Sequence, residues 1–173
     1  MNRLQIIAIG VLHFLLIAAA QIFIFNNIRF LGYINPMIYV WFILMLPYKT
    51  PYWALLLLSF AMGLCIDVFT FGQGFHTATL TFIGFLRPFI LKFYTGNRDI
   101  TVWQRPTSSD MGFMQFTFYI TILIFIHHLL FFTLDILRFT ELIPFIIRLI
   151  LSSVTTIIVI IICDLLFMKH KKD

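Results

Sequence analysis

Apolar residues run along this chain in long stretches, which short polar or proline-containing segments separate. A helix needs roughly 20 mainly apolar residues to cross the hydrocarbon core of a bilayer. The pattern predicts about six transmembrane helices, over residues 4–25, 36–46, 52–69, 76–94, 112–134 and 143–167. It therefore predicts an all-α integral membrane protein, with residues 1–173 forming a single transmembrane domain.

Two of these candidate spans leave alternatives open. Residues 36–46 lie between Pro36 and Pro47 and are too short to cross comfortably, so this segment extends backwards, tilts, or sits as a broken helix against its neighbours. The first span, with Arg3 before its apolar run and alanines at positions 18–20, also fits a cleavable signal peptide. Apolar residues resume at once at positions 22–25, which favours an uncleaved span.

The basic residues outside the spans predict an orientation, because Lys and Arg concentrate in cytoplasmic loops. With both termini in the cytoplasm, the inner segments hold Arg3, Lys49, Arg98, Arg105, Lys169, Lys171 and Lys172. The outer loops then hold only Arg29 and Arg138. We therefore expect cytoplasmic N- and C-termini, with the longest polar connection, residues 95–110, on the cytoplasmic side.

Composition agrees with a membrane protein. Of 173 residues, 61% are hydrophobic and 11% are charged, whereas a soluble domain is about half apolar and about one quarter charged. The net charge of +5 comes from residues at span ends and in short loops, so membrane topology explains it better than a nucleic-acid partner. Cys65 and Cys163 both lie inside apolar runs, so we expect no disulfide framework.

Four ionisable residues fall inside the predicted spans, where a charge usually faces protein or water. They are Asp67, Arg87, Arg148 and Asp164. Depths counted from the helix rise of about 1.5 Å per residue place Asp67 near Arg148, and Arg87 within snorkelling reach of Asp164. We expect these two buried contacts to join the sixth span to the third and fourth. The alternative is that each charge reaches separately to its nearest interface.

The sequence contains no catalytic constellation. His127 and His128 are adjacent and point to different helix faces, so they do not form the i, i+4 pair of a metalloprotease. No Gly-x-Ser-x-Gly motif is present, and neither cysteine has a base nearby in sequence. We therefore expect no enzyme activity, no cofactor and no metal site.

One segment carries a family resemblance. It is Gly63-x-x-x-Asp67-x-Phe69, followed by Gly74-x-His76 at the opening of the next span. With the small size and close-packed spans, this segment resembles the MreD family of rod shape-determining membrane proteins of bacteria. The heavy use of Phe and Ile and the short second span are similar to the versions from Bacteroidetes-type Gram-negative bacteria.

The resemblance implies a non-catalytic scaffold of the cell-wall elongation machinery in the bacterial inner membrane. The implied partners are an MreC-like membrane protein, the MreB filament, and the RodA and penicillin-binding synthases, besides the lipid bilayer. The family is also similar to S-components of vitamin transporters, so a small-molecule-binding transporter subunit is the alternative function. We interpret the singled-out residues as structural or partner-docking: Asp67, Gly72, Gly74, His76, Arg87, Arg148 and Asp164.

Overall fold

The chain is built from helices in the computed structural model, which describes residues 3–27, 34–95, 104–135 and 142–167. In chain order the elements are α1 (Arg3–Phe23), the 3₁₀ turn η1 (Phe25–Asn27), α2 (Tyr39–Leu44), α3 (Tyr52–Thr70), α4 (Phe75–Thr95), α5 (Ser108–Met111), α6 (Phe113–Asp135) and α7 (Leu142–Phe167). The predicted all-α class is confirmed. Arg29, Arg98, Arg138, Lys169, Lys171 and Lys172, which entered the orientation argument, lie outside the described residues.

Four helical segments among the described residues are long and apolar enough to cross a membrane. They are Ala8–Asn27, Tyr52–Thr70, Phe113–Asp135 and Leu142–Phe167, close to four of the predicted spans. Helix α4 is also 21 residues long, but it carries Arg87, Lys92 and several hydroxyl side chains and is not one of the four. These helices indicate a membrane protein.

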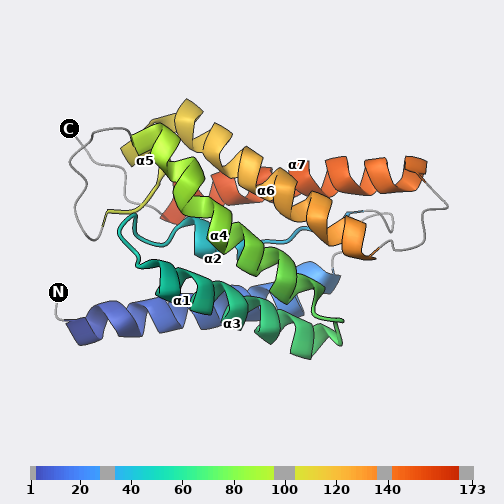
Figure 1. The fold of residues 1–173 in the computed structure, drawn as a ribbon, viewed down its shortest axis with the longest axis horizontal. Helices are drawn as coiled ribbons and strands as arrows, with labels where there is room; N and C mark the ends of the chain where they lie inside the picture. Colours follow the sequence, from blue (N-terminus) through green and yellow to red (C-terminus); the bar gives the residue numbers. More distant parts are fainter. Residues whose placement is uncertain (1–2, 28–33, 96–103, 136–141, 168–173) are drawn as a thin grey trace.

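The five long helices lie alongside one another in a bundle (Figure 1). The start of α1, helix α5 and the end of α7 share one end of the bundle, which we call the α5 end. The connection between α3 and α4 lies at the opposite end, which we call the turn end. Helix α6 is central, since 44% of its apolar stretch is buried inside the bundle. Helix α1 is peripheral, since only 11% of its apolar stretch is buried.

Small residues allow α3 and α4 to pack closely. A Cβ atom added at Gly63 of α3 would lie 2.5 Å from the Cα of Thr77, so only glycine permits the observed approach. A Cβ at Gly84 of α4 would overlap the hydroxyl of Ser59, which is fully buried on α3. Ser59 and Gly63, one turn apart on α3, thus both lie where α3 and α4 approach closely.

A tight connection joins α3 to α4, as the glycines in the sequence predict. Phe71 has a φ of 52° and Gly74 a φ of 85°, both in the left-handed region. The Gly72 N–H donates to the carbonyl oxygen of Asp67 at 2.8 Å, which satisfies one of the acceptors left free at the end of α3. The chain therefore reverses within residues 71–74.

The second predicted span does not form a crossing helix. Only Tyr39–Leu44 is helical, and residues 35–37 before it have no regular structure. Six residues at about 1.5 Å each give a helix of roughly 9 Å, far short of a hydrocarbon core of about 30 Å. Of the alternatives considered, the broken helix is the one found, and the other helices of the bundle surround it.

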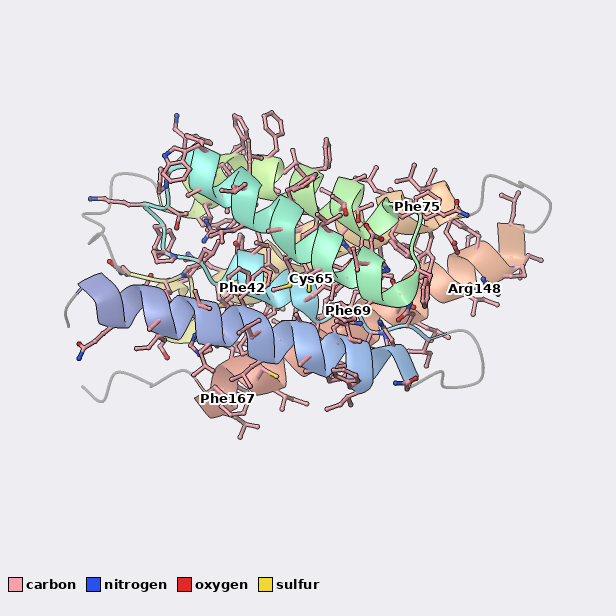
Figure 2. The ribbon with its side chains drawn as sticks, turned by 90° about the horizontal axis from the view of Figure 1, so that it is seen from below. Phe42, Cys65, Phe69, Phe75, Arg148 and Phe167 are labelled. Atoms are coloured by element: carbon pink, nitrogen blue, oxygen red, sulfur yellow. The ribbon has the colours of Figure 1, made fainter. Side chains whose placement is uncertain are left out.

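The surface of the bundle is apolar and its interior holds polar groups. Helix α4 exposes a stripe of phenylalanines at Phe82, Phe85, Phe89 and Phe93. Figure 2 shows α1 with most of its side chains pointing away from the bundle. The buried polar and charged residues are Gln21, Ser59, Asp67, His76, Thr79, Arg87, Ser108, His127, His128, Ser152, Ser153, Thr156 and Asp164. This distribution suits a surface that contacts lipid or other apolar helices.

Candidate functional site

Helix α2 is the centre of the candidate site because it ends inside the bundle at both termini. Each helix end leaves backbone N–H or C=O groups without partners in the helix, and the core of a bilayer contains no water that could bind them. Five of its six residues, all except Trp41, are buried. The surrounding side chains must therefore supply its hydrogen-bond partners.

Three side chains bind the backbone before and at the start of α2. The Gln21 side-chain oxygen, on α1, accepts from the N–H of Ile38 at 2.7 Å, and its amide nitrogen donates to the carbonyl of Pro36 at 3.0 Å. From α7, the Thr156 hydroxyl accepts from the N–H of Met37 at 3.0 Å. The Ser152 hydroxyl, one turn away, accepts from the N–H of residue 35, also at 3.0 Å. The start of α2 is thus tied to two different helices.

Two side chains bind the carbonyl groups at the end of α2. The Arg87 guanidinium, 1% exposed on α4, donates to the carbonyls of Leu44 and Leu46. The Tyr119 hydroxyl, on α6, donates to the Leu44 carbonyl at 3.0 Å. A cation at the C-terminal end of a helix also interacts favourably with the helix dipole. Arg87 therefore acts as a charged C-terminal cap for α2.

A hydrogen-bonded triad of Tyr39, His76 and His127 lies at the start of α2; we call it the Tyr39 triad. The Tyr39 hydroxyl lies 2.8 Å from His76 Nδ1 and 3.0 Å from His127 Nε2. The Thr79 hydroxyl lies 3.3 Å from the same His127 nitrogen. Tyr39 and His127 are fully buried, and His76 is 8% exposed. The triad connects α2, α4 and α6.

His128 extends this polar region toward α7. Its Nδ1 lies 2.9 Å from the carbonyl of Ile124, one turn earlier on α6. Its Nε2 lies 3.3 Å from the hydroxyl of Thr156, which also binds the backbone of Met37. The two adjacent histidines are thus both buried, but they contact different helices.

Asp67 caps the start of α4, although it lies on α3. Its carboxylate accepts hydrogen bonds from the N–H of Thr77 at 2.8 Å, from the Thr77 hydroxyl at 2.5 Å and from the N–H of His76 at 3.3 Å. A carboxylate at a helix N-terminus satisfies free donors and interacts favourably with the helix dipole. A Cβ at Gly72 would overlap this carboxylate, so the glycine leaves room for the cap.

The predicted contact between Asp67 and Arg148 is therefore wrong. All hydrogen bonds of the Asp67 carboxylate in the described structure come from the first residues of α4, nine and ten positions later in the chain. Arg148 does lie at the turn end of the bundle, as Figure 2 shows, with Phe75 at the same end and Phe167 at the opposite end of α7. Depth matching placed it correctly along the bundle but gave Asp67 the wrong partner.

The predicted contact between Arg87 and Asp164 is also wrong. Arg87 binds the carbonyls at the end of α2. One oxygen of Asp164, a fully buried residue, accepts from the backbone N–H of Ser108 at 3.2 Å. Asp164 thus holds α5 against α7 and takes no part in capping α2.

The described part of the 95–110 connection is also held against the bundle. The Tyr48 hydroxyl donates to Asp110 at 2.9 Å, and the Tyr48 N–H donates to the carbonyl of Gln104, also at 2.9 Å. Burial, and next the hydrogen bond to Asp110, raises the pKa of the Tyr48 phenol, which lies between α2 and α3 outside the spans. Residues 104–111 therefore pack on the connection between α2 and α3.

Of the predicted site residues, the structure brings together Asp67, Gly72 and His76 at the turn end, with Gly74 supplying the left-handed turn. The most important residues that the prediction missed are Tyr39, Gln21 and Thr156. Their only signal in the sequence is polar character within apolar runs, beside a segment bounded by two prolines.

No group of three or more His, Cys, Asp or Glu residues in the described ranges is placed to hold a metal ion. Cys65 and Cys163 are free thiols, partly buried on α3 and α7. The arrangement around α2 is thus a set of neutral hydrogen-bonding side chains with one capping arginine. No protein-family model, curated protein or solved structure matches the chain.

Proposed function

We propose that this chain is a non-catalytic membrane scaffold. The supporting observation is that its interior polar groups bind one another. Tyr39, His127 and Thr156 are fully buried, and each is hydrogen-bonded to a different element of the chain. Such bonds between helices fix their arrangement in a membrane. The outward-facing side chains are mainly large and apolar, which suits lipid and partner helices.

The resemblance to the MreD family gives this scaffold a setting. The chain would serve bacterial cell-shape determination in the inner membrane, with both termini in the cytoplasm. An MreC-like protein, the MreB filament, RodA and penicillin-binding synthases would be its partners. Its compact bundle would comprise five long helices and the broken segment that contains α2, six passages of the chain in all.

A small-molecule-binding subunit, similar to the S-components of vitamin transporters, is the second candidate. The observation that favours it is the convergence of polar side chains from α1, α4, α6 and α7 on the start of α2. Binding sites combine such convergent groups, and broken helices line substrate sites in transporters. We prefer the scaffold because these side chains hydrogen-bond one another and the backbone around α2, which leaves His127 Nδ1 without a partner in the described structure.

Depletion of the protein in its bacterial host separates the two functions. For the scaffold, we expect rod-shaped cells to become round, and a plasmid copy of the wild-type gene to restore their width and length. An MreC-like protein should also co-purify with the tagged chain from native membranes in a mild detergent. Depleted cells that keep their shape but require an added vitamin would overturn the scaffold and support the binding subunit.

A further inference from the structure

The Tyr39 triad places one phenol hydroxyl between two ring nitrogens, which is the starting point of the inference. A phenol carries one hydrogen and donates only one hydrogen bond. Two ring nitrogens, His76 Nδ1 and His127 Nε2, nevertheless lie 2.8 and 3.0 Å from the Tyr39 oxygen. One of these nitrogens must therefore carry its own hydrogen and donate to the phenol.

The contacts of the neighbouring Thr79 hydroxyl show which histidine nitrogen carries this hydrogen. The nearest partner of the Thr79 hydroxyl is the Phe75 carbonyl at 2.7 Å, so this hydroxyl donates there and accepts from His127 Nε2 at 3.3 Å. His127 therefore carries its hydrogen on Nε2, and the Tyr39 hydroxyl donates to a bare Nδ1 of His76. This assignment rests on the hydrogen-bond network, as tautomers generally do. In this state both hydrogen bonds of the triad are satisfied.

His76 is the residue of the triad best placed to accept an additional proton. It is 8% exposed, whereas Tyr39 and His127 are fully buried. The His127 Nδ1 atom has no hydrogen-bond partner in the described structure, so a proton placed there would find no acceptor. The carboxylate of Asp67 accepts from the backbone of His76 and supplies a negative charge beside it.

The groups that face His76 are known for each helix packed against α4. Helix α3 presents Asp67 and α2 presents Tyr39, while α6 presents the apolar ring of Phe131 and, through the shared Tyr39 hydroxyl, His127. Asp67 favours a cation at His76, and Tyr39 and His127 are neutral hydrogen-bonding partners in the assignment above.

We propose that the Tyr39 triad binds a proton at His76 Nδ1, and that this binding loosens α2. A protonated Nδ1 donates, so the Tyr39 oxygen then faces two donors and its own hydrogen loses its acceptor. Among the described residues, that hydroxyl also contacts the Thr79 hydroxyl, which already accepts from His127, and the sulfur of Met37 at 3.8 Å, which is a weak acceptor. Because Tyr39 is the first residue of α2, the protonation state of His76 decides how firmly α2 is held.

Two measurements on the full chain in lipid nanodiscs test this proposal. Nitrogen NMR of 15N-histidine-labelled protein, titrated from pH 8 to pH 4, follows both ring nitrogens of each histidine. We expect the His76 resonances to change from a neutral tautomer to imidazolium, while those of His127 remain neutral. Hydrogen exchange of residues 37–45, corrected for the intrinsic pH dependence, should rise several-fold over the same transition.

Matched variants distinguish proton binding at His76 from a non-specific loosening of the protein at low pH. His76→Gln keeps a hydrogen-bonding side chain but does not titrate, and it should abolish the pH-dependent rise in exchange. His13→Gln alters an exposed histidine on α1, outside the triad, and should leave the rise intact. A His76 that stays neutral down to pH 4 in the wild-type protein, or an equal rise in His76→Gln, would overturn the proposal. The wild-type titration decides the matter even if a variant does not fold.

Discussion

Replacement of Asp67 by alanine tests the cap that joins α3 to α4. The change leaves the N–H groups of His76 and Thr77 without their acceptor at a residue that is only 4% exposed. A hydrogen bond to a charged group contributes about 1.5–3 kcal/mol, and loss of an N-terminal cap costs about 0.5–2 kcal/mol. The Thr77 hydroxyl can turn toward another acceptor, so we count only the backbone bonds. We expect Asp67→Ala to lower the free energy of unfolding by about 2–4 kcal/mol.

Gly72 makes this prediction more specific. A Cβ at Gly72 would overlap the Asp67 carboxylate, so Gly72→Ala alone should cost about 1–3 kcal/mol by overpacking. In the Asp67→Ala background the carboxylate is absent and the added methyl group fits better. The two changes should therefore couple by at least about 1 kcal/mol, with the double variant more stable than the sum of the single effects.

Unfolding of the purified protein by sodium dodecyl sulfate in mixed micelles, followed by tryptophan fluorescence, measures these free energies. Gly74→Ala is the matched control, because Gly74 has a φ of 85° and open space around its Cα. It should cost about 1–3 kcal/mol from backbone strain and be additive with Asp67→Ala. Additive effects of Asp67→Ala and Gly72→Ala would refute the reasoning, as would an unchanged stability of Asp67→Ala.

Two further predictions concern the start of α2 and the connection between α2 and α3. Thr156→Val removes the acceptor for the N–H of Met37 and should lower the free energy of unfolding by about 1–3 kcal/mol. Thr155→Val, at an exposed hydroxyl on the same helix, should change it by less than about 0.5 kcal/mol. Equal effects of the two variants in the same assay would contradict the role of Thr156. Folding raises the Tyr48 pKa above its ordinary value of 10.0, so the stabilisation from the buried, protonated phenol is fully present below that pH and is lost as the pH rises above it. Stability should therefore fall more steeply above about pH 10 in the wild-type protein than in Tyr48→Phe, and parallel profiles would argue against the Tyr48–Asp110 bond.

The long helices could be predicted from the sequence because their signal is local. Helices α3, α6 and α7 begin and end within one residue of the predicted spans 52–69, 112–134 and 143–167. An uninterrupted apolar run is sufficient for such a helix, since every interior backbone group finds its partner within the run. The glycines at positions 72 and 74 mark the connection between α3 and α4, where Gly74 takes a positive φ, whereas the positive φ of Phe71 has no signal in the sequence.

The contacts of the buried polar residues could not be predicted in the same way. Counting depth along helices placed Asp67 opposite Arg148, but the free N–H groups at the start of α4 lie closer and bind it. Likewise, Arg87 was expected to bind a carboxylate, and it binds the carbonyl groups that the end of α2 leaves free. The free N–H and C=O groups at helix ends are strong hydrogen-bonding partners. A prediction that only pairs opposite charges by their depth leaves these groups out.

The sequence by itself determined the membrane class, the positions of the long helices and the presence of rare ionisable groups within them. The tertiary structure alone decided that residues 36–46 contain only the short helix Tyr39–Leu44, with both ends inside the bundle. A break in a buried helix is stable only when other helices supply donors and acceptors to its ends. Those partners are Gln21, Thr156, Arg87 and Tyr119, which lie far from α2 in the chain and come from four different helices.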